Sequence, residues 1–169
     1  MKETVRVETA AGMRALGRRL ARLLRAGDLV ILNGPLGAGK TTLVQGIGSG
    51  LRVRGPVTSP TFVIARVHPA AAGPALVHAD AYRLGSVSEV DDLDLDADTA
   101  RSVTVVEWGE GLAEELAEDR LEISIAPDPG PGAAAIPDVG GDEDSPRTVR
   151  LSGIGPRWSD VALPPAEAG

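Results

Sequence analysis

The chain has 169 residues, which suits one domain with a substantial core and is too short for two large ones. Its net charge of −7 argues against sequence-independent binding to nucleic acid or to an anionic membrane, and the absence of cysteine excludes disulfides and thiolate metal sites. Residues 1–4 lack the apolar core of a signal peptide and no apolar run approaches the roughly 18 residues that span a bilayer, so we expect a soluble cytoplasmic protein.

The N-terminal residues predict a strand and then an amphipathic helix. Valines alternate with charged neighbours over 4–8, the period-two pattern of a half-buried strand. Thr9 can cap a helix whose apolar residues recur at helical spacing as far as Arg25, with Gly27 as a stop signal. Arginines cover the other faces of this helix. We interpret them as a solvated surface, and binding to RNA or to a partner protein is the alternative.

Segment 29–42 passes from a short apolar strand into Gly34-x-x-x-x-Gly39-Lys40-Thr41, the complete phosphate-loop pattern. In such a loop, backbone amides surround a polyphosphate and the following helix directs its positive N-terminal end at the same anion. We therefore expect Lys40 to reach the β- and γ-phosphates and the Thr41 hydroxyl to bind Mg²⁺. A glycine-rich turn without a ligand is the alternative. The residues expected to contact the nucleotide here are Leu36, Gly37, Ala38, Gly39, Lys40, Thr41 and Thr42.

Lysine usage singles out the same position. The chain has 17 basic residues, but its only lysines are Lys2 and Lys40. A compact ammonium between phosphate oxygens is not interchangeable with a guanidinium fork. The one internal lysine therefore lies where lysine chemistry is needed.

After the loop, the pattern continues as a helix to about Leu51, although three glycines weaken its later turns by roughly 1 kcal/mol each relative to alanine. A loop over 52–60 leads to a predicted strand over 61–68. A short Pro/Ala/Gly turn separates this strand from a second one over 75–80. The spacing resembles a hairpin, so we expect a mixed sheet rather than a parallel one.

The C-terminal half predicts three more strands, over 103–106, 121–125 and 148–151, and a short helix over 111–118. The acidic run at 88–98 is interpreted as an exposed helix or loop, with a cation site as the alternative. We expect one domain over 1–154 that contains a low-complexity loop at 127–147, followed by a disordered tail at 155–169.

Two carboxylates lie at the ends of predicted strands: Asp80 ends the strand over 75–80, and Glu107 ends the apolar run over 103–106. Ligands of open α/β sheets gather beyond the carboxyl ends of strands, and a nucleotide hydrolase needs carboxylates that hold Mg²⁺ or orient water. We expect both carboxylates to converge on the metal beside Thr41. A surface position for either of them is the alternative.

Other side chains near these positions have two interpretations each. The hydroxyls of Ser59 and Thr61 either respond to the γ-phosphate or belong to a proline-set turn. His78 shares a strand face with Asp80 and either supports the site or is a structural histidine. Trp108 either covers the nucleotide or packs in the core.

Four segments, in this order and spacing, resemble the bacterial TsaE (YjeE) family, small ATPases of tRNA threonylcarbamoyladenosine modification. They are 34–42, 58–62, 78–84 and 106–108. The similarity covers roughly 5–125. The acidic run and the low-complexity insertion depart from the family pattern but leave the site segments intact.

The resemblance implies an α/β P-loop NTPase-like fold in three layers, with helices on both faces of a mixed central sheet. It implies ATP and Mg²⁺ as cofactors and weak ATP hydrolysis. It also implies action with TsaB and TsaD, which use the product of a TsaC-type enzyme to install threonylcarbamoyl on adenosine 37 of tRNA. Contact with tRNA would be indirect, through this complex.

Carried over by position, the resemblance assigns roles to individual residues. Lys40 and Thr41 hold phosphate and metal. Ser59 and Thr61 lie in a switch-like loop. Asp80 and Glu107 serve the metal and water, and Trp108 lies by the nucleotide.

Three other functions compete with this interpretation. A GTPase is disfavoured because the guanine-reading Asn-Lys-x-Asp is absent. A small-molecule or nucleotide kinase would share the phosphate loop, but no arginine-rich lid segment follows the last strands. A nucleotide-gated assembly factor with little turnover is the non-enzyme alternative. The sequence shows no obvious activating arginine, so we predict slow hydrolysis by the isolated chain.

Overall fold

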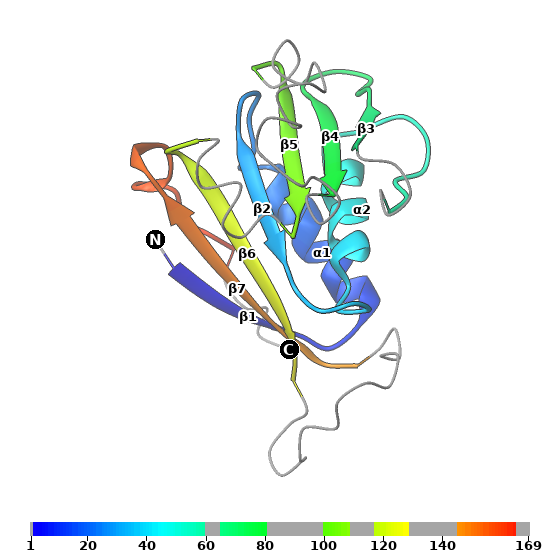
Figure 1. The fold of residues 1–169 in the computed structure, drawn as a ribbon, viewed down its shortest axis with the longest axis vertical. Coiled ribbons are helices and arrows are strands. Elements are labelled where there is room, and N and C mark those ends of the chain that lie inside the picture. The colour runs from blue at the N-terminus through cyan, green and yellow to red at the C-terminus, as the bar shows by residue number, and fades with distance from the viewer. Residues whose placement is uncertain (1, 60–64, 81–99, 109–116, 129–144, 165–169) are drawn as a thin grey trace.

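The computed structural model describes residues 2–59, 65–80, 100–108, 117–128 and 145–164, and these residues form an α/β fold with a mixed sheet (Figure 1). The helices are α1 (Ala10–Ala21) and α2 (Lys40–Gly50). The strands are β1 (Lys2–Val7), β2 (Leu29–Asn33), β3 (Ala65–His68), β4 (Ala75–Asp80), β5 (Ser102–Glu107), β6 (Arg120–Pro127) and β7 (Arg147–Ile154). Among the described residues, no helix is long and apolar enough to cross a membrane.

The seven described strands lie in the order β1-β7-β6-β2-β5-β4-β3. Strands β6, β2, β5 and β4 run parallel, whereas β3 and the β7–β1 pair are antiparallel additions at the two sides. Residues 29–32 of the central strand β2 are all buried, as expected for a strand covered on both faces. The predicted hairpin of β3 with β4 is confirmed, and the predicted last strand, β7, pairs antiparallel with β6.

Both helices lie on one face of the sheet, behind it in the view of Figure 1, and enclose the core with the strands. α1 and α2 contact each other through glycine. A Cβ at Gly17 would overlap the Leu43 carbonyl oxygen, and one at Gly46 would overlap that of Arg14. Gly46, one of the glycines that weaken α2 as an isolated helix, therefore allows the backbone of α2 to approach α1 closely.

α1 is shorter than the sequence predicted. α1 ends at Ala21 rather than near Arg25, because its last turn tightens into i to i−3 bonds and Asp28 Oδ2 accepts the Arg25 backbone N–H at 2.8 Å. Helices were also expected on both faces of the sheet. Both described α-helices share one face, and the helix expected at 111–118 lies largely outside the described residues. The acidic run at 88–98 and most of the low-complexity loop also lie outside them.

The expectation of a disordered tail is wrong for residues 155–164. A short 3₁₀ helix, Pro156–Trp158, follows β7 directly, and the Trp158 side chain is buried at 1% exposure. The Arg157 guanidinium donates from Nε and Nη2 to the two carboxylate oxygens of Asp28 at 3.0 and 2.9 Å. Low-complexity composition predicted disorder, but burial of one indole and one ion pair fixes this segment against the domain.

Replacing Arg157 with methionine is expected to lower the free energy of unfolding by about 2–4 kcal/mol, because it leaves the buried Asp28 carboxylate without its main partner. Arg150→Met on the exposed side of β7 is the matched control and should cost well under 1 kcal/mol. Urea unfolding followed by circular dichroism measures both. Equal losses in the two variants would contradict a specific role for the pair.

Candidate functional site

The phosphate loop joins β2 to α2 and depends on glycines with left-handed backbone. Gly37 and Gly39 have φ of 76° and 99°, which a residue with a Cβ adopts only with strain. Gly39 is the N-cap of α2, and no side chain caps this end of the helix. The amides of its first turn are thus left for a ligand.

Lys40 begins α2 and turns back over the loop that precedes it. Its Nζ donates to the carbonyl oxygens of Gly34 at 2.7 Å and Pro35 at 2.9 Å, and the side chain is 7% exposed. Burial lowers the pKa of Lys40, while the carboxylates of Glu107 and Asp80 act in the opposite direction. The ammonium therefore lies inside the loop, in the field of both predicted carboxylates.

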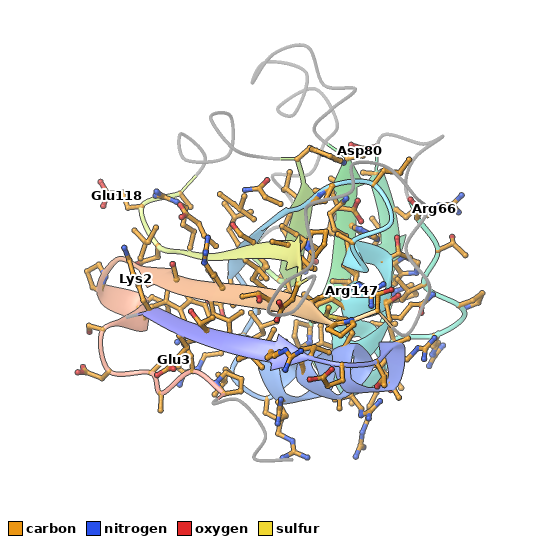
Figure 2. All side chains as sticks on the ribbon, turned by 90° about the horizontal axis from the view of Figure 1, so that it is seen from below. Lys2, Glu3, Arg66, Asp80, Glu118 and Arg147 are labelled. Atoms are coloured by element: carbon orange, nitrogen blue, oxygen red, sulfur yellow. The ribbon has the colours of Figure 1, made fainter. Side chains whose placement is uncertain are left out.

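The sheet brings Asp80 and Glu107 together as neighbours. They end the parallel strands β4 and β5 and are direct partners in the strand register, and Glu107 is also in register with Leu32 of β2. Adjacent strands are about 4.8 Å apart, so the two carboxylates share the edge from which the phosphate loop leaves. Both are buried, and Figure 2 shows Asp80 at the end of its strand.

His78 lies on the same strand face as Asp80, two residues earlier. Its Nε2 and the Glu107 Oε1 are 2.7 Å apart, and the imidazole is fully buried. This contact favours the interpretation that His78 supports the site, because its ring touches one of the two predicted site carboxylates. An ionised carboxylate can only accept a hydrogen bond, so toward an ionised Glu107 the Nε2 nitrogen would be the donor.

Trp108 covers the lysine. Its ring centroid is 4.3 Å from Lys40 Nζ, a cation–π contact, and the residue is 39% exposed. Its backbone has φ of 59°, an outlier for a bulky residue, and its N–H donates to Leu32 O at 3.0 Å. Strained backbone of this kind concentrates at functional sites, where the surrounding structure holds it in place. Trp108 therefore lies at the site rather than in the core.

The other predicted residues are distributed around this centre. Thr41 and Thr42 lie half-buried in the first turn of α2, and Ser59 is half-buried in the loop after it. In the phosphate loop, Ala38 is buried, whereas Leu36 projects into solvent at 94% exposure. Thr61 lies outside the described residues.

Arg147 is a residue beside the loop that the sequence did not indicate. It begins β7 and is buried at 6% exposure, and a Cβ at Gly39 would lie 3.4 Å from its Nε. Its Nη1 donates to Ser145 O at 2.8 Å. The only signal in the sequence is its position immediately before a predicted strand, because no motif links β7 to a loop more than 100 residues earlier.

The described residues fit a nucleotide with Mg²⁺. They contain no group of three or more His, Asp or Glu residues spaced to hold a metal by themselves. Mg²⁺ instead takes one or two carboxylates together with substrate phosphates and water, which matches Asp80, Glu107 and the Thr41 hydroxyl beside a phosphate loop. The first turn of α2 has no side-chain cap, so its amides can meet a phosphate.

The fold and this loop define a P-loop NTPase-like protein. Comparison with known proteins gives a narrower result: the model of the family described as "Threonylcarbamoyl adenosine biosynthesis protein TsaE" matches residues 7–131. The chain belongs to the TsaE family.

Individual relatives agree with this assignment. A Streptomyces coelicolor protein named tRNA threonylcarbamoyladenosine biosynthesis protein TsaE is 60% identical over 155 residues, which cover 89% of this chain and 98% of the relative. The Bacillus subtilis protein of the same name is 39% identical over 113 residues, 66% of this chain and 70% of the relative. The crystal structure of Bacillus subtilis YdiB matches with a TM-score of 0.70 at 26% identity, covering 94% of this chain and 89% of that one.

Proposed function

We propose that this chain binds ATP with Mg²⁺ and hydrolyses it slowly in the cytoplasm, as a step required for forming the threonylcarbamoyl group on adenosine 37 of tRNA. The observation that carries the proposal is the position of Lys40, inside a complete phosphate loop and in the field of two strand-end carboxylates. Membership of the TsaE family supports the link to tRNA modification.

The loop residues would bind the triphosphate. Lys40 exchanges the carbonyl oxygens of Gly34 and Pro35 for phosphate oxygens, which are stronger acceptors because they carry charge. The uncapped amides at the start of α2 add donors without reorganisation. Trp108 shields this ammonium from water on its outer side.

The carboxylates would bind the metal and orient water. Mg²⁺, when bound, neutralises charge that develops on the phosphates. Thr41, Asp80 and Glu107 are the residues that would hold it. Glu107 would also orient an attacking water; its position at the end of the strand next to the phosphate loop and its contact through Oε1 support this role.

Turnover by the isolated chain should be slow. The sequence shows no obvious activating arginine, and P-loop enzymes without one hydrolyse on the order of 10⁻⁴ nucleotides per second. We propose that a complex of TsaB and TsaD type supplies the missing stimulation. The net charge of −7 favours contact with tRNA through that complex rather than directly.

Phosphate release from ATP and from GTP, measured for this protein alone and with the TsaB and TsaD proteins of its organism, tests the proposal. We expect slow release that prefers ATP and rises when the partners are added. Preference for GTP would contradict the proposed nucleotide. Indifference to the partners would contradict the proposed assembly and favour an independent kinase or hydrolase.

A further inference from the structure

His78 makes its hydrogen bond to the Glu107 carboxylate. The imidazole is fully buried, and Nδ1 has no hydrogen-bond partner among the described residues. Its contact with Glu107 Oε1, at 2.7 Å, is therefore the one polar interaction that this ring makes there. Burying a polar ring with one nitrogen unsatisfied costs free energy, which a purely structural position would avoid with an apolar side chain.

Glu107 is close enough to Lys40 to influence it electrostatically, yet the two do not pair. Burial lowers the Lys40 pKa, and of the two carboxylates that raise it Glu107 has the larger effect. The Lys40 ammonium nevertheless bonds to two backbone carbonyls, and the Glu107 carboxylate bonds to His78. Opposite charges in a buried site attract strongly, so something must keep this carboxylate from closing onto the ammonium.

We propose that His78 is a positioning residue that holds Glu107 by Oε1, and so prevents an ion pair between Glu107 and Lys40 that would occupy the phosphate-binding ammonium. The inference rests on the proposed function, because it assumes that Lys40 binds the phosphates of ATP. It assigns His78 an effect on nucleotide affinity that acts entirely through Glu107.

A pair of substitutions of similar length separates this role from simple packing. His78→Gln keeps an N–H donor near the position of Nε2, whereas His78→Met has similar length and no donor. We expect His78→Gln to bind Mg-ATP as the wild type does. We expect His78→Met to bind it about tenfold more weakly or worse, the effect of one hydrogen bond to a charged group.

The decisive measurement is a double-mutant cycle on ATP affinity, by titration calorimetry of the full chain. In the Glu107→Gln background residue 107 no longer carries a carboxylate that could close onto Lys40, so His78→Met should change affinity little there. Weakening of the same size in both backgrounds would mean that His78 acts through packing and would overturn the proposal. Wild-type affinity in His78→Met alone would overturn it too.

Two further comparisons keep the test decisive. If His78→Met does not fold, His78→Asn replaces it, because the asparagine amide is too short to reach Glu107. Equal affinities of the Gln and Asn variants would then overturn the proposal. A wild-type chain that binds no ATP would overturn the proposed function and this inference with it. If the wild type binds ATP but His78→Met weakens binding equally in both backgrounds, only the inference is overturned.

Discussion

Replacing Lys40 with alanine is expected to remove detectable ATP binding at concentrations that saturate the wild type. The ammonium is buried at 7% exposure in the loop, where its charge meets little competition from water. Truncating one partner of a buried charge pair costs about 2–5 kcal/mol, which weakens binding at least about thirtyfold. Folding should be little affected, because Pro35 is exposed and Gly34 half-buried, so water can replace the lost donor.

The chain supplies its own control for this variant. Lys2 is the only other lysine and lies exposed on β1, so Lys2→Ala removes the same charge without touching the site. Titration calorimetry with Mg-ATP should show wild-type affinity for Lys2→Ala and none for Lys40→Ala. Lys40→Arg should also bind poorly, because a planar guanidinium does not fit where a compact ammonium lies. Wild-type affinity in Lys40→Ala would remove the loop lysine from the proposed site.

Replacing Glu107 with glutamine is expected to retain ATP binding and to lose turnover. The amide oxygen can still accept from His78, so the local structure should persist. An amide can neither activate water nor hold Mg²⁺ as a carboxylate does. We expect the hydrolysis rate to fall by about 10²- to 10⁴-fold, the usual contribution of a positioned general base. Glu107→Ala should show the same separation of binding from turnover.

Glu122→Gln is the matched control for this second prediction. Glu122 is a half-buried carboxylate near the start of β6, far from the carboxyl end of that strand, in register with Ile31 and paired with Arg120 at 2.8 Å. It lies away from the carboxyl ends of the strands, so its neutralisation should leave both affinity and rate near the wild-type values. Single-turnover phosphate release separates the two quantities. Equal activity of Glu107→Gln and the wild type would exclude Glu107 from the proposed chemistry.

Local patterns in the sequence were enough to predict the centre of the site. The phosphate-loop motif identified the β2–α2 junction, and the ends of two apolar runs identified Asp80 and Glu107. The predicted positions of these residues in the fold agree with the structure, because each depends on short-range features: a strand period and a glycine spacing. Their roles toward ATP and Mg²⁺ remain predictions.

Features that depend on contacts between distant segments were not predictable in the same way. The sequence left open whether His78 supports the site, because its contact with Glu107 arises only when β4 pairs with β5. The left-handed backbone at Trp108 and the position of Arg147 beside Gly39 likewise follow from tertiary packing.

The tail and the glycines show how tertiary structure overrides local composition. Residues 155–164 resemble a flexible tail, yet Trp158 is buried and Arg157 pairs with Asp28. The glycines of α2 are unfavourable for an isolated helix. Gly46 is nevertheless required because it meets the backbone of α1, an approach that helix propensity does not describe.

Reconstitution of tRNA threonylcarbamoylation tests the central claim most directly. The TsaB, TsaD and TsaC-type proteins of the same organism are incubated with tRNA and ATP, with and without this chain, and modified adenosine at position 37 is quantified. We predict sustained modification with the wild-type chain and with Lys2→Ala, and its loss without the chain or with Lys40→Ala or Glu107→Gln. Equal modification in the absence of the chain, or with the Lys40→Ala variant, would contradict a required ATPase step by this protein.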